Sequence, residues 1–205
     1  MPLNAGENTI ELVCLNNRKT FINETTFCSF DSITSTVDQA ETIVNANFDN
    51  GTDDFTFIGN RNDPDYSSGE RDSNELTNNS QALITVLGGV DNTRVRNIFG
   101  SWSQTFTTTG GSFTLSLDAN LIQASDYEAN EFSQIGIIID GQRQPLDTIT
   151  GDGNGGPVMS SGLQTYTIPL NLAAGEHTLS LACFNNQKTL NNETTTCVFD
   201  NILIE

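Results

Sequence analysis

The sequence is poor in positive charge and has no long apolar run. Eight Lys and Arg oppose 26 Asp and Glu, so the net charge is -18 over 205 residues. Nucleic acids and anionic membranes attract positive protein surfaces, and both are therefore excluded as partners. No apolar stretch approaches the ~20 residues that cross a bilayer, and no signal peptide is visible. The sequence predicts no membrane insertion and is typical of a mature or excised portion of an exported protein.

The first stretch of the chain repeats the last. Residues 3–35 align with residues 172–204 at a constant offset of 169 without a gap, and 19 of the 33 pairs are identical. Self-similarity at a fixed period indicates a repeat architecture. The sequence therefore predicts a partial repeat over residues 1–36 and one full repeat over residues 38–205, which is long enough to bury a core.

The four cysteines form two pairs that the duplication relates, Cys14 with Cys28 and Cys183 with Cys197. Four cysteines allow three pairings, and the duplication favours one disulfide within each copy. Each would close a short loop and stabilise the fold by about 3 kcal/mol in the chain-entropy model. Zinc binding is the alternative, but the single histidine, His177, is replaced by asparagine in the other copy. Disulfides indicate an oxidising compartment, and we expect an extracellular or cell-surface protein.

Alternating apolar and polar residues dominate the chain, and no helical periodicity of any length is present. Gly, Asn and Asp clusters separate the alternating stretches. This pattern predicts an all-β fold, an antiparallel two-sheet β-sandwich of the jelly-roll type, with about nine strands. Residues 121–131 are predicted to hold a short helical turn. The predicted strands are residues 42–48, 54–58, 81–87, 101–108, 112–117, 134–140, 164–170, 177–184 and 196–204.

The duplicated segment is predicted to be a β-hairpin, so the chain would carry an extra N-terminal hairpin. An isolated two-stranded hairpin is marginally stable in water. Three arrangements follow: the chain is cut from a longer tandem protein, the hairpin docks on a neighbouring subunit by strand addition, or it packs on its own domain as an extra edge. Docking on a neighbour would generate a head-to-tail assembly. The apolar positions expected to be buried in that contact are Ile10, Leu12, Phe30 and Ile33.

Both ends of the full repeat resemble a known group of modules. Residues 45–51 (NANFDNG) with 54–57 (DFTF), and residues 199–204 (FDNILI), resemble the opening and closing strands of galactose-binding-like jelly rolls among carbohydrate-binding modules. The resemblance implies a jelly roll and a carbohydrate-binding or adhesive role. Interior segments that are similar to a repeated module of large secreted surface proteins are residues 87–91, 100–106, 127–133, 151–156 and 184–189.

The resemblance also implies a structural calcium ion between the first and last strands. Its ligands would include Asp49 and Asp200, and Asp31 matches Asp200 in the partial copy. Calcium prefers six to eight oxygen ligands from carboxylates, amides and carbonyls. The residues themselves leave other positions open, namely the acidic loop Asp126, Glu128 and Glu131 and the turn with Asp152 and Asn154.

Aromatic side chains that stack on sugars are few, with one Trp and three Tyr in the chain. Trp102 lies in an alternating strand and is predicted to pack in the core. Tyr66 and Tyr127 lie in predicted loops and are the candidates for stacking on a glycan. Four Asn-X-Ser/Thr sequons are candidate glycosylation sites, and one recurs at the same place in both copies. They are Asn23, Asn50, Asn78 and Asn192.

Catalytic constellations are missing from the sequence. The lone His177 is not repeated, and the cysteines are assigned to disulfides, so no Ser-His or Cys-His pair is available. The acidic loop is the nearest candidate for a glycosidase carboxylate pair, but such clusters are expected in a chain with 26 acids. We therefore expect no enzyme activity.

Two functional hypotheses result from the sequence. The first is a non-catalytic extracellular subunit of a fibre or surface array, which assembles with copies of itself or neighbouring repeats through its terminal hairpin. The alternative is a carbohydrate-binding or adhesive module of a secreted multidomain protein, stabilised by calcium, with glycans as partners. Self-association at the termini distinguishes the first hypothesis, and affinity for a sugar distinguishes the second.

Overall fold

A computed structural model describes Cys14 and residues 44–60, 64–73, 81–153 and 156–205. The chain divides into two compact units, Met1–Ala40 and Glu41–Glu205. Within the first unit only Cys14 is described, and it is disulfide-bonded. The remaining predictions for that unit lie outside the described residues: the Cys28 partner, the extra hairpin, the sequon at Asn23, Asp31, and the assembly positions Ile10, Leu12, Phe30 and Ile33.

The second unit is almost entirely β-structure, as predicted. Its described strands are antiparallel to their neighbours, and a single 3-10 turn, η1 (Pro64–Tyr66), interrupts them. The strands are β1 (Val44–Ala46), β2 (Thr56–Ile58), β3 (Ser67–Ser73), β4 (Gln81–Gly88), β5 (Val95–Gln123), β6 (Phe132–Ile139), β7 (Gln142–Thr150), β8 (Met159–Ser160), β9 (Gln164–Lys188) and β10 (Thr194–Ile204).

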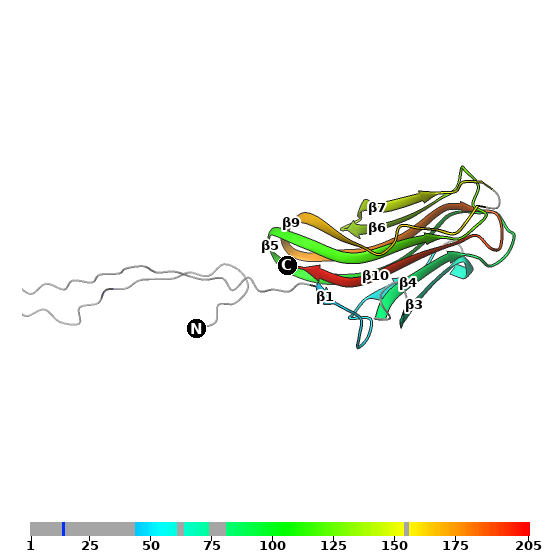
Figure 1. The fold of residues 1–205 in the computed structure, drawn as a ribbon. Coiled ribbons are helices and arrows are strands. Elements are labelled where there is room, and N and C mark those ends of the chain that lie inside the picture. Colours follow the sequence, from blue (N-terminus) through cyan, green and yellow to red (C-terminus); the bar gives the residue numbers. More distant parts are fainter. Residues whose placement is uncertain (1–13, 15–43, 61–63, 74–80, 154–155) are drawn as a thin grey trace, which may run out of the picture. The chain divides into compact units, whose positions relative to one another are not determined.

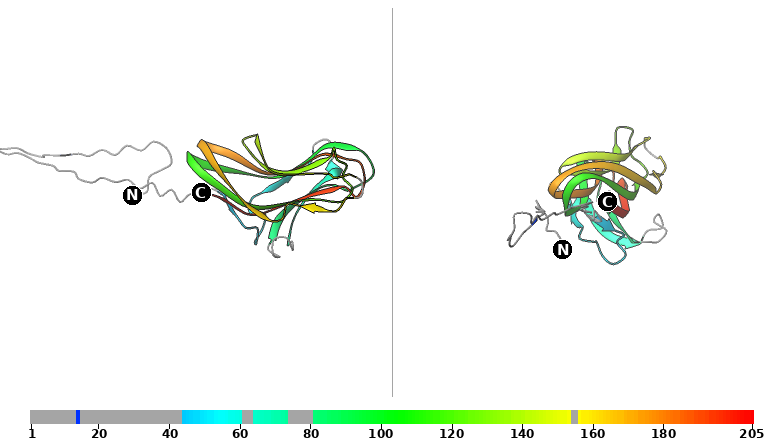
Figure 2. Two further views of the ribbon diagram at one scale, coloured as in Figure 1. Left: turned by 45° about the horizontal axis from the view of Figure 1, so that its top comes forward. Right: turned by 90° about the vertical axis from the view of Figure 1, so that its left-hand side faces the viewer.

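The strands follow the order β3-β4-β10-β5-β9-β6-β7, and β1 pairs with β10 while β2 and β8 pair with β5. The two long strands β5 and β9 run beside each other for almost their whole length. The second half of β5 also pairs with β10, whereas the first half pairs with β2. β5 and β9 therefore belong to both layers of the sandwich, with β3, β4 and β10 on one side and β6 and β7 on the other (Figures 1 and 2).

Glycines allow β5 and β9 to pass between the layers. Gly110 and Gly111 in β5 have φ of 86° and 134°, and Gly175 in β9 has φ of 132°. Residues with a side chain rarely adopt these values. The sequence predicts two separate strands on either side of Gly110 and Gly111, residues 101–108 and 112–117, and likewise two strands within β9. Both predictions are wrong because the ladder continues through the glycines, from Thr109 opposite Ala174 to Gly111 opposite Leu172.

One hydrophobic core fills the space between the layers. It combines Leu83 and Phe199 from one layer with Leu181 and Ile137 from the other. Trp102 belongs to this core, as predicted, and its indole N–H donates to the carbonyl of Ile84. The cluster is large and continuous, which makes burial of apolar surface the main stabilising term for this unit.

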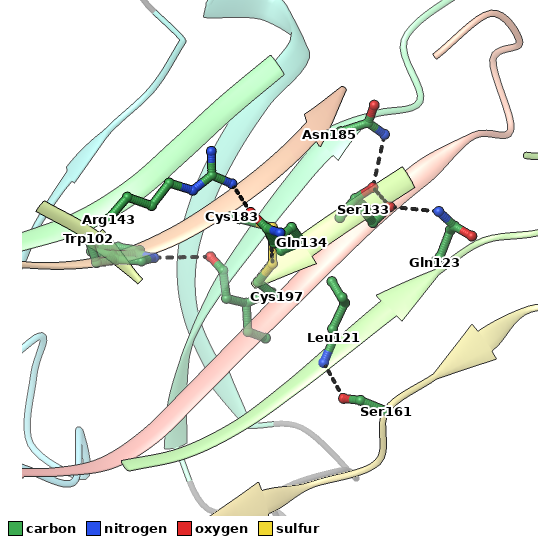
Figure 3. Close-up of a disulfide and its surroundings, with 12 residues drawn as sticks. Trp102, Leu121, Gln123, Ser133, Gln134, Arg143, Ser161, Cys183, Asn185 and Cys197 are labelled. Carbon is green, nitrogen blue, oxygen red and sulfur yellow. Dashed lines mark hydrogen bonds between the residues drawn. A yellow bond between two sulfur atoms is a disulfide. The ribbon is translucent and has the colours of Figure 1, made fainter. Parts of the chain in front are cut away.

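A disulfide joins the layers through the core. Cys183 of β9 and Cys197 of β10 are bonded, with Cα atoms 5.7 Å apart, as predicted (Figure 3). β9 and β10 are not hydrogen-bonded neighbours. The C-terminal copy of the duplicated segment therefore does not form a hairpin at a sheet edge. Each of its strands lies inside a layer, β9 between β5 and β6, and β10 between β4 and β5.

The other differences from the predicted elements concern short or polar strands. β3, β7 and β8 lie in regions where no strand is predicted, and no helical turn forms over residues 121–131. β3 is rich in Ser, Gly and charged residues and pairs only with β4. Its sequence therefore lacks the alternation of apolar and polar residues that predicts a strand. Within the part of the chain that the structure describes, no helix has the length and apolar character to cross a membrane.

Candidate functional site

The outer side of one layer carries a row of partly exposed apolar side chains. In β5, β9 and β6, alternate residues such as Trp102, Leu181 and Ile137 point into the core. Their neighbours point the other way, and Phe99 of β5 lies directly opposite Phe184 of β9. We call this surface the aromatic face and define it by five residues: Ile58, Phe99, Phe132, Ile138 and Phe184.

The aromatic face contains a pocket of about 400 Å³. That volume falls in the range of roughly 300–1,000 Å³ found for small-ligand sites. Ile58, which is 42% exposed, forms one wall of it. Among the residues that the structure describes, those lining the pocket carry apolar, hydroxyl or amide groups and none is ionisable: Ile58, Gly59, Asn60, Phe99, Ser101, Ile138 and Ser180.

An arginine lies beside the pocket on the same face. The guanidinium carbon of Arg143 is 4.4 Å from the centre of the Phe184 ring, within the range of a cation–π contact. Arg143 also donates to Gln134 (Figure 3). The amide of Gln134 donates in turn to the hydroxyl of Thr148 at 2.9 Å. Arg143 lies directly opposite Ile138 in the β6–β7 pairing, and Ile138 lines the pocket. The N–H groups of the Arg143 side chain therefore lie at the margin of the pocket.

The two tyrosines predicted to stack on a glycan do not lie on any open surface. Tyr66 is 6% exposed, and its hydroxyl donates to Asp91 at 2.8 Å. Tyr127 is 1% exposed; its hydroxyl accepts a hydrogen bond from Asn185 at 2.6 Å and shares one with Thr195. That prediction is wrong: Tyr127 lies in a loop and Tyr66 ends the 3-10 turn η1, but burial leaves neither ring a face for a ligand.

Three carboxylates meet at the end of the sandwich. Glu128 lies in the loop after β5, Glu131 lies just before β6, and Glu193 lies just before β10. One carboxylate oxygen from each lies within 4.8 Å of the others. Glu131 and Glu193 are fully buried. The structure thus brings together two of the three acids in the predicted acidic loop and adds Glu193, while Asp126 instead accepts from the side chain of Asn192.

Local donors hold the carboxylate cluster, which we define as Glu128, Glu131 and Glu193. Glu131 accepts from the amide of Gln187 at 2.9 Å, and Gln187 accepts from the guanidinium of Arg94. Thr189 donates its hydroxyl to Glu128 and Glu193. The main-chain N–H groups of Thr189 and Leu190 also donate to the Glu193 carboxylate, that of Leu190 at 2.9 Å.

Burial, together with the nearby Glu128 carboxyl, raises the pKa of Glu131 to about 7. A hydrogen bond from Glu131 lowers the pKa of Glu128. Glu131 is buried and Glu128 is partly buried. Like charges this close repel each other, so one proton shared between the two carboxyls offsets that repulsion. The arrangement does not suit glycoside hydrolysis, because that reaction needs two carboxyls at least ~5 Å apart across an open cleft, whereas Glu131 and Glu193 are enclosed.

The two predicted calcium ligands lie in different surroundings. Asp49 is exposed and accepts from Asn47 at 3.0 Å, and Asp200 is buried and accepts from the N–H of Asn201. The guanidinium of Arg71 donates to the main-chain carbonyls of Phe48 and Asp49. Main-chain carbonyl oxygens are among the ligands that calcium takes, and here the two carbonyls beside Asp49 are bonded to the Arg71 guanidinium instead of being left for a metal ion. Calcium binding by Asp49 and Asp200 stays a prediction.

Two of the predicted glycosylation positions are described. Asn50 lies in the turn after β1 and Asn192 in the loop before β10, and both are exposed. Exposure is the condition that a glycan requires. Modification of these two stays a prediction, and Asn78, like Asn23, lies outside the described residues.

Comparison with known proteins gives matches to solved structures. No protein-family model matches the sequence, and no curated protein sequence matches it. The fold is similar to the CBM22-1 xylan-binding domain of Paenibacillus barcinonensis Xyn10C, with 10% identity over 80% of this chain and 94% of that one and a TM-score of 0.43. It is also similar to a carbohydrate-binding module of Cellvibrio mixtus lichenase 5A solved with cellotriose, with 15% identity, coverage of 80% and 97%, and a TM-score of 0.35.

Similar chains also include enzymes. An exo-β-1,3-galactanase from Phanerochaete chrysosporium, solved with β-1,3-galactotriose, shares 14% identity over 79% of this chain, with a TM-score of 0.35. The present chain covers 29% of that enzyme, less than a third of its length.

The sequence analysis missed the aromatic face and Glu193. Phenylalanine is usually a core residue, but alternation with Trp102 and Leu181 places Phe99 and Phe184 on the other side of their strands. Glu193 follows Glu131 by 62 positions, so sequence proximity gives no signal. A signal for Glu193 does exist in the duplication, since Glu24 occupies the same place in the first copy.

Proposed function

We propose that this chain is a non-catalytic carbohydrate-binding module of a secreted multidomain protein, and that it binds a neutral glycan on the aromatic face. The observation that carries the proposal is the uncharged pocket between Ile58, Phe99 and Ile138. The chain has a net charge of -18, yet none of the described residues that line this pocket is ionisable. Such a lining favours uncharged ligands that carry both apolar surface and hydroxyl groups.

Sugars have this combination, because a pyranose ring presents C–H groups on its face and hydroxyls at its rim. An exposed aromatic ring supplies a flat apolar surface with a polarised edge. The rings of Phe132 and Phe184 lie 5.9 Å apart and extend that surface beyond the pocket. Hydroxyls of Ser101 and Ser180 and the amide of Asn60 supply partners for sugar hydroxyls.

The disulfide between Cys183 and Cys197 supports the proposed secreted setting. Disulfides persist in oxidising compartments and are rare in the cytosol. A glycan partner outside the cell is consistent with that setting, and the net charge of -18 argues against a nucleic acid.

A glycan array followed by calorimetric titration tests the proposal. Phe99→Leu and Phe184→Leu remove an aromatic ring but keep an apolar side chain, and Leu15 already stands at the position of Phe184 in the first copy. We expect each to weaken binding about ten-fold or more, which corresponds to about 1.4 kcal/mol. Val158→Ala is the control, because Val158 is exposed and lies outside the aromatic face. An array without any ligand, or variants that bind like the unaltered chain, would overturn the proposal.

A second candidate is a structural subunit that assembles through its terminal segments. The observation that favours it is the duplication of residues 172–204 at the other end of the chain. Light scattering of the full chain beside a version without residues 1–36 separates the candidates. Large assemblies that become monomers on truncation support a structural subunit, and equally stable monomers exclude it.

A further inference from the structure

The second unit has one place for the duplicated strand pair. Residues 172–204 form the second half of β9 and all of β10, and these strands lie inside their layers (Figure 1). We call this place the strand slot: the space between β5 and β6 in one layer and between β4 and β5 in the other. A segment fills the slot only if its side chains match partners on all of these strands.

Buried polar residues are the most demanding part of that match. Asn185 donates to Tyr127, Thr195 shares a hydrogen bond with Ser133, and Lys188 donates to the carbonyl of Asp91. A buried polar group without such a partner is costly. Five buried polar residues of the slot have identical counterparts in the first copy at an offset of 169: Asn185 and Asn16, Lys188 and Lys19, Glu193 and Glu24, Thr195 and Thr26, and Asp200 and Asp31.

The apolar and disulfide positions of the slot match as well. In the slot, the side chains of the second copy at these positions pack in the core. The same side chains in an exposed hairpin would have nothing to pack against. The pairs are Leu181 and Leu12, Phe199 and Phe30, Ile202 and Ile33, Cys183 and Cys14, and Cys197 and Cys28, with Leu179 matched by Ile10.

The connection to the rest of the chain also permits an exchange. β1 pairs with the end of β10, with Val44 opposite Ile204. Ser35 is the counterpart of Ile204. If the first copy filled the slot, residues 36–43 would link it to β1 as the loop of an antiparallel pair. This loop is longer than the common hairpin loops of about two to five residues but shorter than the about 12–15 residues above which loops become uncommon.

Four differences explain why the second copy occupies the slot in this structure. Gln187 is buried and accepts from the guanidinium of Arg94, and the first copy has a second cation, Arg18, at that place. Ile204 and Val198 are fully buried, and the first copy has serine at both places. His177 bonds Asp140 at 2.7 Å, and the first copy has Asn8 instead. The first copy would lose apolar burial and one ion pair, so it fits with lower stability.

We propose that residues 3–35 are an alternative occupant of the strand slot. The first copy enters the slot of its own unit when the second copy is displaced, or enters the slot of a second molecule of this chain by strand exchange. The chain thereby carries two segments that can fill one strand slot. Strand exchange between molecules links copies of the chain and does not require an exposed sheet edge.

Displacement of the second copy in the full chain tests this proposal. Leu181→Asp together with Phe199→Asp puts two charges into the core and excludes residues 172–204 from the slot. The single Trp102 lies opposite Leu181 in the β5–β9 pairing, so its fluorescence reports whether the slot is filled. Hydrogen exchange read by mass spectrometry reports which copy fills it, and size exclusion separates exchange within a chain from exchange between chains.

We expect this variant to keep a buried Trp102 with a lower melting temperature, and to gain exchange protection in residues 6–35. Adding Leu12→Asp and Phe30→Asp should then abolish folding, whereas those two substitutions alone should leave Trp102 buried. A displaced variant that exposes Trp102, or that gains no protection in residues 6–35, would overturn the proposal.

Discussion

His177 of β9 lies with its Nδ1 atom 2.7 Å from the Oδ2 atom of Asp140. Its other ring nitrogen, Nε2, is 2.9 Å from the carbonyl oxygen of Ala173. Both partners accept hydrogen bonds, so both ring nitrogens are satisfied as donors only when the ring is protonated. The hydrogen bond to Asp140, followed by that to Ala173, raises the pKa of His177, and the same pair lowers the pKa of Asp140.

The pair therefore stabilises the fold within a limited pH window. The His177 contribution is complete below its unfolded pKa of about 6.5 and is lost as pH rises through the raised folded value. The Asp140 contribution is present above its unfolded pKa of about 3.8 and is lost as pH falls through the lowered folded value. His177→Asn should lower the free energy of unfolding by at most about 1 kcal/mol near pH 5.5 and by less at pH 8.5. Urea unfolding measures this; Glu176→Gln, at an exposed neighbour, is the control, and an equal loss at both pH values would contradict the account.

Glu131 should act in the opposite direction to the Asp140 carboxylate. Its folded pKa of about 7 lies above the unfolded value of 4.5, so it favours the folded state below pH 4.5 and this advantage is lost as pH rises through 7. Glu131→Gln keeps a neutral side chain and should reduce the fall in stability between pH 5.5 and pH 8 in buffer with chelator. Glu70→Gln, at an exposed acid, should not. A rise in melting temperature with added calcium that Glu131→Gln abolishes would show that a cation, rather than a proton, balances the cluster.

The disulfide in the core should make a large contribution to the free energy of unfolding of the second unit. Cys183 and Cys197 are separated by 14 positions, and a loop of about 15 residues corresponds to about 3 kcal/mol in the chain-entropy model. Replacing both with Ala should lower the unfolding free energy of the second unit by about that amount, measured through Trp102 fluorescence in urea. Replacing Cys14 and Cys28 with Ala is the matched control, and an equal loss from this control would contradict the account.

Arg143 should affect ligand binding more than stability. Arg143 is an exposed residue whose guanidinium lies over the ring of Phe184 and donates to Gln134. Arg143→Lys keeps the charge but loses the planar group that stacks on a ring. We expect a few-fold weaker glycan affinity by calorimetry and a change of less than about 0.5 kcal/mol in unfolding free energy. A large loss of stability with unchanged affinity would show that Arg143 supports the strands instead of the ligand.

Most of the fold follows from local patterns in the sequence. Alternation predicts the strands around Trp102, Leu181 and Phe199, and the duplication predicts the Cys183–Cys197 bond. The glycine pair in β5 misleads because Gly110 and Gly111 favour turns as isolated residues, whereas the long ladder with β9 keeps them in a strand. Tertiary pairing of this kind leaves no local signal.

The candidate site was less accessible to sequence reasoning. Tyr66 and Tyr127 have the residue type of a sugar platform but bond inward to Asp91 and Asn185. Phe99 and Phe184 have the residue type of a core but lie on the outer side of their strands. Residue type predicts burial on average, whereas the side of the strand decides it here.

Chemical-shift mapping of the chain with a glycan selected on the array tests the central claim most directly. The account predicts that main-chain amide shifts concentrate at Phe99, Ser101, Ile138 and Ser180 around the pocket. Shifts confined to the loop end, around Asp126 and Asn192, would place the ligand elsewhere and contradict the account, as would a spectrum that no glycan changes.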